Sequence, residues 1–350
     1  MRAQGIDVLI RGAGPVGCAL AAALQGSGLK IGVLGRTGAT PSFRPIALSY
    51  ASRLILERLG AWKGLAVTPI ETIHVSQQQG FGRTVMDAAD AGVPALGYVA
   101  EYSDLLSLLQ RRCDGLFVAQ ESAARCVVHA EGTAEEGREK RYAQDAVVAL
   151  VRTQPVSGTT AFERFTPEGP LALLPLAGRY ALVWSCRPER ALRLAQCDDE
   201  LFLGELRAAA GRGPGSPVEV QGRAVQPLAL RVHPARVAQR AAYIGNAAQT
   251  LHPVAGQGLN VGLRDAWDLS RAFLESADPG DAGTLARYAA SRRADTHAAI
   301  RITDALAGAF LGSNPIARAA RGVALTALDL LPGPRRFFAR RMIYGPSALP

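Results

Sequence analysis

The stretch from residue 6 to residue 17 reads Ile-Asp-Val-Leu-Ile-Arg-Gly-Ala-Gly-Pro-Val-Gly. Its first five residues are typical of a short buried strand, and the Ala/Leu-rich run from Cys18 to Gln25 is typical of a helix. A second apolar run, from Lys30 to Leu34, indicates a second strand. The stretch therefore predicts a βαβ unit with G-x-G-x-x-G at its first turn, which is the context in which this motif binds a dinucleotide.

Each glycine of this first motif has a distinct structural role. Gly12 permits the tight turn, Gly14 lets the backbone approach a pyrophosphate, and Gly17 lets helix and strand pack closely. The free amides at the start of the helix face the phosphates, and Pro15 suits a first helical turn because no donor is needed there. The cofactor-binding residues expected at this turn are Gly12, Ala13, Gly14, Pro15, Val16 and Gly17.

One feature of the motif is missing. The acidic residue that normally ends the second strand and binds the ribose hydroxyl is replaced by Gly35, followed by Arg36. An arginine in this place suits a 2′-phosphate and would favour NADP over FAD. The first motif therefore leaves the nucleotide open, and a purely structural glycine turn remains an alternative.

A second glycine-rich stretch covers residues 241 to 269. A short strand is expected to end at Gly245-Asn246, a loop carries His252-Pro253 and Gly256-Gln257-Gly258, and a helix is expected to begin near Leu259-Asn260. Glycines crowded before a helix expose several backbone amides together, which favours an anion or a partly negative carbonyl. The N1–C2 edge of a reduced flavin has this character.

This second stretch resembles the second FAD fingerprint of the p-hydroxybenzoate-hydroxylase-like monooxygenases, and most closely that of the ubiquinone-biosynthesis hydroxylases (the UbiH/UbiF/VisC/Coq6 family). Residues 44–50, 56–62 and 162–175 agree with the same family. The resemblance runs over most of the chain. It implies a mixed α/β fold with a Rossmann-like FAD-binding domain, an inserted β-sheet substrate domain and a helical C-terminus.

The resemblance also implies roles for residues outside the first motif. Arg44 is expected near the cofactor phosphates and ribityl chain, and Asn246 in the ribityl or pyrophosphate region. Glu131 stands in the place of Asp in a middle Asp-Gly fingerprint, and Arg36 could replace the missing ribose partner. The residues expected at the N1–C2 edge of the ring are Gly256, Gln257, Gly258 and Asn260, and Leu259 is a further expected cofactor-binding residue.

No catalytic residue is assigned with certainty. His252 and Pro253 are expected to line the flavin region, where His252 could act as a base but is better explained by packing on the cofactor. The chain has no G-x-S-x-G and no H-E-x-x-H, and nothing that resembles a Ser-His-Asp signature. In the family reaction, NAD(P)H reduces FAD, and a flavin C4a-hydroperoxide formed with O2 transfers one oxygen to an aromatic ring. The resemblance therefore implies a hydroxylase of a polyprenylated phenol, in which the protein orients the ring and excludes water.

The middle of the chain departs from the family. Cys126 to Gly132 matches the strand and turn of the middle fingerprint, but only Phe117 to Arg125 separates it from the helix expected to end near Cys113. The family normally has several strands there. Together with the missing acid at position 35, this keeps open a non-catalytic scaffold protein of a quinone-biosynthesis complex. A flavin dehydrogenase or reductase on the same fold is a third reading.

The predicted domain organisation is discontinuous. The substrate domain is expected to contain sheet because of alternating apolar patterns such as that from Tyr180 to Trp184. The predicted segments are 1–70, 97–138 and 235–290 for the FAD-binding domain, 71–96 and 139–234 for the substrate domain, and 291–350 for the C-terminal helical segment.

Composition limits the remaining function classes. The 350 residues carry a formal charge of +9, almost all of it from arginine, without a motif that reads nucleic acid. The five cysteines form no C-x-x-C pair, which argues against a disulfide framework or a metal site and fits a reducing cytoplasm. No signal peptide and no membrane-spanning run is expected. Residues 335–343 mix arginines with large apolar side chains, so they form either an interfacial helix at the inner face of the cell membrane or a packed terminal helix with a basic outer face.

Overall fold

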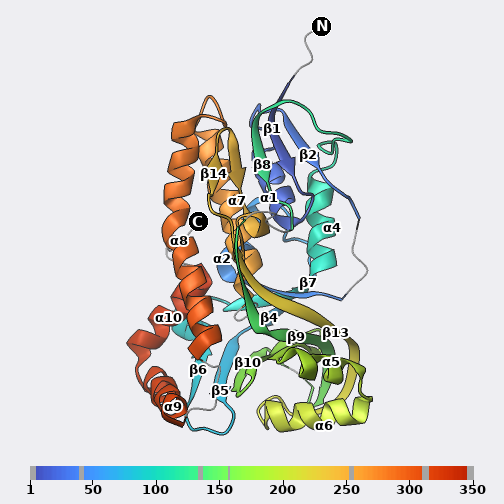
Figure 1. The fold of residues 1–350 in the computed structure, drawn as a ribbon, viewed down its shortest axis with the longest axis vertical. Helices are drawn as coiled ribbons and strands as arrows, with labels where there is room; N and C mark the ends of the chain where they lie inside the picture. Colours follow the sequence, from blue (N-terminus) through green and yellow to red (C-terminus); the bar gives the residue numbers. More distant parts are fainter. Residues whose placement is uncertain are drawn as a thin grey trace.

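The computed structural model of the chain is a mixed α/β fold with three sheets (Figure 1). The structure describes residues 5–38, 43–132, 137–156, 158–251, 256–309 and 315–344. His252 and Pro253, two of the predicted site residues, lie outside these ranges.

A five-stranded sheet is built on the N-terminal βαβ unit. Its strands, in spatial order, are β14 (Val237–Ala238), β15 (Ala241–Tyr243), β8 (Ala124–His129), β1 (Ile6–Arg11) and β2 (Ile31–Leu34). β1 pairs in parallel with both β8 and β2, and Val8, Ile10 and Val128 are fully buried. A parallel sheet covered on both faces needs such continuous apolar runs. The predicted strand, turn, helix and strand are therefore all present, with the helix α1 at Pro15–Leu24.

The shortened middle region is a single extended crossing. Between α4 (Tyr102–Arg112) and β8, the described chain forms only one isolated bridge, between Val33 and Phe117. Val33 exchanges backbone hydrogen bonds with Leu116 and Val118 at 2.8 and 3.0 Å. This crossing thus pairs with the outer edge of β2 at Val33 and covers part of that edge.

An eight-stranded sheet forms the second half. Its spatial order is β16 (Gln249–Thr250), β13 (Ser216–Val232), β9 (Arg138–Gln154), β12 (Arg179–Cys186), β11 (Gly169–Leu176), β10 (Thr160–Thr166), β5 (Thr72–Gln77) and β6 (Arg83–Asp87). Alternate residues point to opposite faces, as the period of a strand requires. Val147 and Ala149 pack under the helices α5 (Pro188–Gln196) and α6 (Asp199–Ala210). Their neighbours Ala146 and Val148 face the other way and line a cleft.

A small third sheet joins the two halves. It contains β3 (Pro45–Ser49), β7 (Gly97–Glu101) and β4 (Thr68–Ile70), and it lies between the larger sheets in Figure 1. The helix α2 (Tyr50–Arg58) follows β3 directly, and the short α3 (Ala88–Ala91) follows β6. β3 thus contacts the start of α7, through hydrogen bonds of Ala47 and Ser49 to Asn260.

The remaining helices are α7 (Gln257–Leu274), α8 (Ala282–Ala309), α9 (Pro315–Leu330) and α10 (Pro332–Tyr344), and a 3-10 turn, η1, covers Gly245–Ala247. α7 begins two residues before the predicted start near Leu259, because Gly256 adopts a left-handed conformation with φ 59° and becomes the N-cap. α8 runs through the predicted segment boundary at residue 291, so that boundary does not coincide with a break in the fold. Among the described helices, none combines the length and the apolar character that a bilayer crossing requires.

The two glycine-rich motifs contact each other directly through Val16. A Cβ built on Gly262 of α7 would lie 2.7 Å from Val16 Cγ2 and 3.2 Å from the Gly245 Cα, and one built on Gly245 would lie 3.1 Å from Val16 Cγ1. The Val16 side chain therefore occupies the space that side chains at positions 245 and 262 would need. This contact fixes α1 against α7 and η1.

Substitution of Gly262 tests this contact. Gly262→Ala gains about 1 kcal/mol of helix propensity but overpacks against Val16, a strain of typically about 1–3 kcal/mol, so we expect a net loss of stability. Gly204→Ala, in the interior of α6 where a new Cβ meets nothing within 4 Å, is the matched control and should raise the unfolding free energy. Urea denaturation of both variants measures the difference. Equal and positive changes in the two variants would contradict the close packing.

Candidate functional site

A cleft of about 1390 Å³ runs between the two large sheets and brings most of the predicted site residues together. The predicted residues that line it are Gly12, Ala13, Gly14, Pro15, Val16, Arg36, Arg44, Glu131, Asn246, Gly256, Gln257, Gly258, Leu259 and Asn260. Gly17 lies behind the turn rather than in the wall of the cleft. The two glycine-rich motifs, about 240 residues apart in the chain, therefore form one continuous site.

The three glycines of the first motif are required for different reasons. Gly12 has φ +115°, and a Cβ there would lie 2.5 Å from the Ala130 carbonyl oxygen. A Cβ on Gly17 would lie 2.0 Å from the Gly12 carbonyl oxygen. Gly14 is different, because its φ is −75° and a Cβ would meet only the Tyr102 hydroxyl, at 3.8 Å. Protein packing thus does not require glycine at position 14, whereas a ligand that approached the turn closely from the cleft would require it.

Two helix N-termini open into this cleft. α1 starts after Gly14 and α7 after Gly256, and neither start has a side-chain cap or an acidic residue in its first turn. A Cβ on Gly258 would meet nothing within 4 Å, so the start of α7 is also unobstructed. Uncapped first-turn amides need an acceptor, and the helix dipole favours a negative one. The cleft therefore presents two anion-favouring ends to one elongated ligand.

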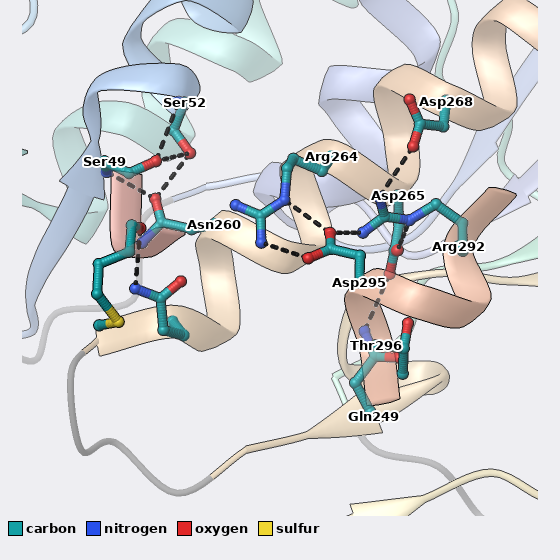
Figure 2. A network of polar contacts seen from close by, with 12 residues as sticks. Ser49, Ser52, Gln249, Asn260, Arg264, Asp265, Asp268, Arg292, Asp295 and Thr296 are labelled. Carbon is teal, nitrogen blue, oxygen red and sulfur yellow. Dashed lines mark hydrogen bonds and ion pairs between the residues drawn. The ribbon is translucent and has the colours of Figure 1, made fainter. Parts of the chain in front are cut away.

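Asn260 holds the start of α7 in place. Its Nδ2 donates to the carbonyl oxygens of Ala47 and Gly256, both at 2.9 Å, and its Oδ1 accepts from Ser49 N at 2.8 Å and Ser52 Oγ at 2.7 Å (Figure 2). The side chain is 2% exposed and all of its usual hydrogen-bonding positions are used. Asn260 therefore positions the turn, and contact with a ligand at this point falls to the backbone around it.

Arg44 and Tyr102 form a pair at the mouth of the cleft. The Arg44 guanidinium lies 4.7 Å from the centroid of the Tyr102 ring, and Tyr102 N donates to the Arg44 carbonyl oxygen at 2.9 Å. Burial raises the pKa of Tyr102, so its hydroxyl stays protonated and can donate. Arg44 is one of the predicted site residues, whereas Tyr102 was not predicted, because it follows β7 and reaches the cleft through the pairing of β3 with β7.

The chain at the end of β8, which includes the predicted site residue Glu131, packs over the first glycine-rich turn. The backbone nitrogen of Glu131 would lie 2.8 Å from a Cβ on Gly12, and the Glu131 carboxylate contacts His129 Nδ1 at 3.3 Å. Asn246 Nδ2 donates to the Gly132 carbonyl oxygen at 3.4 Å. The middle fingerprint and the second fingerprint are thus joined at the centre of the cleft, despite the shortened region before β8.

Gly35 is packed against the first turn. A Cβ there would lie 2.7 Å from Ala13 N and 2.9 Å from Ala13 Cβ, so an acidic residue at this position would have to push the turn away. Arg36 is exposed and lines the same end of the cleft. The ribose partner of the usual motif is therefore absent here for a steric reason as well as in sequence.

A buried ion network, which was not predicted from the sequence, supports the second motif from behind. Its members are Arg236, Arg264, Asp265, Asp268, Arg292 and Asp295, with Gln249 and Thr296 as neutral partners; all of them except Arg236 are labelled in Figure 2. Asp265 receives Arg292 Nε at 2.7 Å and Gly245 N at 3.1 Å, which ties α8 to η1. Three arginines balance three aspartates, so no net charge is left in the interior.

The network holds its carboxylates ionised. Burial opposes the charged form of Asp265, but the guanidinium groups of Arg236 and Arg292 outweigh it and lower the pKa of this carboxyl. The same balance, with Arg264 and Arg292, lowers the pKa of Asp295. For Asp268 burial prevails and the pKa is raised. Asp265 therefore remains an acceptor for the backbone of η1 across the neutral pH range.

The far end of the cleft is an apolar chamber. Residues of the eight-stranded sheet line it, and α9 and α10 supply another part of its lining. The residues that α9 and α10 contribute are Arg321, Ala324, Leu325, Leu328, Phe338, Ala339, Met342 and Ile343. Such a lining suits an apolar organic molecule larger than a single ring.

Comparison with known proteins identifies this arrangement. The profile of the FAD binding domain family matches residues 113–303, more than half of the chain. The chain belongs to the FAD-dependent monooxygenase family. It is 31% identical to ubiquinone hydroxylase UbiL of Rhodospirillum rubrum over 95% of this chain and 88% of that protein, and 27% identical to the 3-demethoxyubiquinol 3-hydroxylase of Escherichia coli over 94% and 96%. Both alignments, of 383 and 377 residues, are longer than the 350 residues of the chain, so these relatives contain residues with no counterpart here.

The fold agrees with this membership. The crystal structure of p-nitrophenol 4-monooxygenase from Pseudomonas putida superposes with a TM-score of 0.78 at 16% identity, over 96% of this chain and 97% of that one. The first motif lies outside the matched profile, so its part in the site is supported by the cleft geometry.

FAD fits the cleft of this monooxygenase chain. The open backbone at Gly14 and the start of α1 suit the pyrophosphate, and the uncapped start of α7 at Gly256–Leu259 suits the N1–C2 edge of the ring. When bound, the flavin accepts hydride from NAD(P)H and activates O2, chemistry that no protein side chain supplies.

Substitution of Gly14 separates cofactor binding from folding. Gly14→Ala leaves the fold intact because the new Cβ has room, but it projects into the path of the pyrophosphate, so we expect FAD affinity to fall at least about tenfold, or 1.4 kcal/mol. Flavin fluorescence titration measures the affinity, circular dichroism checks the fold, and Gly204→Ala is the control without access to the cleft. Unchanged FAD affinity would show that the ligand does not approach this turn.

Proposed function

We propose that this flavin monooxygenase hydroxylates the aromatic ring of a polyprenylated phenol in ubiquinone biosynthesis, with NAD(P)H as reductant. The observation that carries the proposal is the apolar chamber at the flavin end of the cleft, which is large enough for a ring with an attached alkyl chain. The two relatives named for reactions on ubiquinone or its precursors match over nearly the whole chain, which supports the same substrate class.

The residues of this chain have defined parts in the proposed reaction. Asn260 and Ser49 hold the start of α7, whose amides face the ring edge where negative charge develops on reduction. The sheet wall, with Val148, Ala172 and Val183, orients the substrate ring, and Leu325 of α9 excludes water. The flavin, when bound, provides the oxygen-transfer chemistry.

Oxygen labelling tests this function. The protein loaded with FAD should be yellow, should oxidise NAD(P)H faster when ortho-prenylphenol is added, and should place one atom of labelled O2 in the product. Mass spectrometry of the product decides the outcome. Flavin reduction without oxygen in the product would indicate a dehydrogenase or reductase instead.

One observation favours the alternative that the protein is a non-catalytic scaffold: at Gly35 the adenosine ribose lacks its usual acidic partner. A protein that binds partner proteins of quinone biosynthesis, but shows no turnover after FAD has been loaded to saturation, would favour that reading. Robust hydroxylation would exclude it.

We also propose that α9 and α10 rest on an anionic membrane surface from which the substrate enters. Their outward side chains include Ile316, Val323, Leu330 and Phe337, which are 79%, 60%, 73% and 71% exposed. Within Pro315–Tyr344 the acidic residue Asp329 stands against six arginines. The same two helices form a wall of the chamber, so this surface is the shortest route for a lipid-like substrate.

Vesicle flotation tests the membrane proposal. Leu330→Ser with Phe337→Ser should weaken binding to phosphatidylglycerol vesicles at least about tenfold, since burying each large apolar side chain contributes about 1.5–3 kcal/mol. The control is Leu192→Ser with Leu201→Ser on α5 and α6, where the side chains are 51% and 52% exposed but lie at the other end of the eight-stranded sheet. Equal flotation of the two double variants would contradict the proposal.

A further inference from the structure

The sheet wall of the chamber contains one continuous row of facing side chains across six strands. Strand register places the members of the row opposite one another, from β6 to β9, as Thr84, Val75, Glu163, Ala172, Val183 and Val148. All six line the cleft. Four of the six are small or branched apolar residues, so Thr84 and Glu163 are the polar positions of this row.

Glu163 has no partner among the described residues. None of them forms a hydrogen bond or an ion pair with its carboxyl, which is half-buried between Val75 and Ala172. Desolvation raises its pKa to about 7. The adjacent residues on β10, Phe162 and Arg164, belong to the alternate face of the strand, where Arg164 donates to Ser76. A carboxyl kept without a partner in an apolar wall costs stability, which is expected of a group that serves a ligand.

Thr84 gives a second, independent sign of a ligand. Its side chain is 1% exposed, and its Oγ1 has no hydrogen-bond partner in the described structure. It stands two strands from Glu163, about 10 Å away at the usual strand spacing. The row thus offers two separate polar points among four apolar residues.

We propose that Glu163 binds the phenolic hydroxyl of the substrate and accepts its proton. This assignment rests on the proposed function. The phenol O–H donates to the Glu163 carboxylate, and as the ring attacks the oxygen atom delivered from the flavin side the proton moves from the phenol oxygen to the carboxylate. The electron pair of the broken O–H bond stays on the phenol oxygen and raises the electron density of the ring. When the ring rearomatises, the carbon that received the oxygen loses its hydrogen as a proton, which would neutralise the oxygen atom left on the cofactor. The proton held by Glu163 then returns to the phenol oxygen, so Glu163 ends in its starting state. Thr84 is placed for a second oxygen substituent.

Other charged groups do not take this role. Among the described residues, the other titratable side chains that line the same cleft are Arg11, Arg36, Arg44, Tyr102, Glu131 and Arg321. Arg321 of α9 faces the chamber and donates to Gln77 Oε1 at 3.5 Å, and the other five line the cofactor end. On the strands beside β10, the row contributes Val75 and Ala172. Glu163 is therefore the carboxyl that the chamber presents to a substrate.

The central experiment compares Glu163→Gln with the wild type on ortho-prenylphenol and on its methyl ether, which has no proton to donate. Binding of each probe to the FAD-loaded protein is measured by flavin fluorescence, and turnover is measured across pH. In the wild type, kcat/KM should fall as the pH drops below about 7, since the carboxyl then becomes protonated. In the Glu163→Gln variant this acidic limb should vanish, kcat should fall about a hundredfold or more, and the binding preference for phenol over ether should fall at least about tenfold.

Two further variants separate a substrate role from a structural one. Glu163→Met replaces a desolvated carboxyl by an apolar side chain of similar length, so Tm should rise while activity falls. Glu163→Asp should keep the pH dependence at reduced rate. Glu219→Gln is the control, because this carboxylate of β13 pairs with Arg152 at 2.7 Å outside the cleft and should leave kinetics and probe binding unchanged.

The outcomes are distinguishable. An unaltered pH profile and probe preference in Glu163→Gln, or a lower Tm in Glu163→Met, overturns the assignment of Glu163 even if the wild type hydroxylates phenols. A wild type that shows no turnover, but whose preference for phenol over ether is lost in Glu163→Gln, refutes the proposed function while leaving the binding role of Glu163 in place.

Discussion

The close contact of Val16 with Gly245 and Gly262 is the constraint on which the site depends. It joins the first glycine-rich motif to the second, so the distance between the two anion-favouring helix starts is set by one side chain rather than by flexible loops. Interiors packed at crystal density transmit small changes. A displacement of α1 against α7 would therefore alter the length of the cleft and the fit of an elongated dinucleotide.

Behind this contact, a buried carboxylate accepts a backbone hydrogen bond, which apolar packing could not do. η1 has polar amides that need acceptors in the interior, and Asp265 supplies one for Gly245. The carboxylate is tolerated because Arg236 and Arg292 lie at 3.1 and 2.7 Å. Buried ion pairs are weak evidence of added stability, but they are sensitive to geometry. The network thus specifies where α8 stands relative to the second motif.

Much of the fold could be predicted from the sequence because its decisive signals are local. The strand, turn and helix around Gly12 follow from neighbouring residues, and so does the turn before α7. The start of α8 could also have been predicted, because Asp281 is a typical N-cap residue and accepts a hydrogen bond from Thr284 N at 2.9 Å. The start of α7 was misplaced by two residues because Gly256 takes a left-handed conformation that permits an earlier start.

The parts of the site that the sequence did not reveal are those made by distant strands. Tyr102 reaches the cleft through the pairing of β3 with β7, and Glu163 is singled out by a register that crosses six strands. Sequence spacing carries no information on such pairings when the connections differ in length. The ion network was invisible for the same reason, because Asp265 and Arg292 look like ordinary members of exposed helix faces until α7 and α8 are packed together.

The position of α9 and α10 has a consequence for how the protein is made. All three sheets and the sites for the two ends of the nucleotide are encoded before residue 275, whereas the helices α9 and α10 that line the apolar chamber are translated after residue 314. Domains begin to fold in the order of synthesis. A nascent chain therefore exposes the apolar residues of the sheet side of the chamber to water until α9 and α10 have been synthesised and have packed.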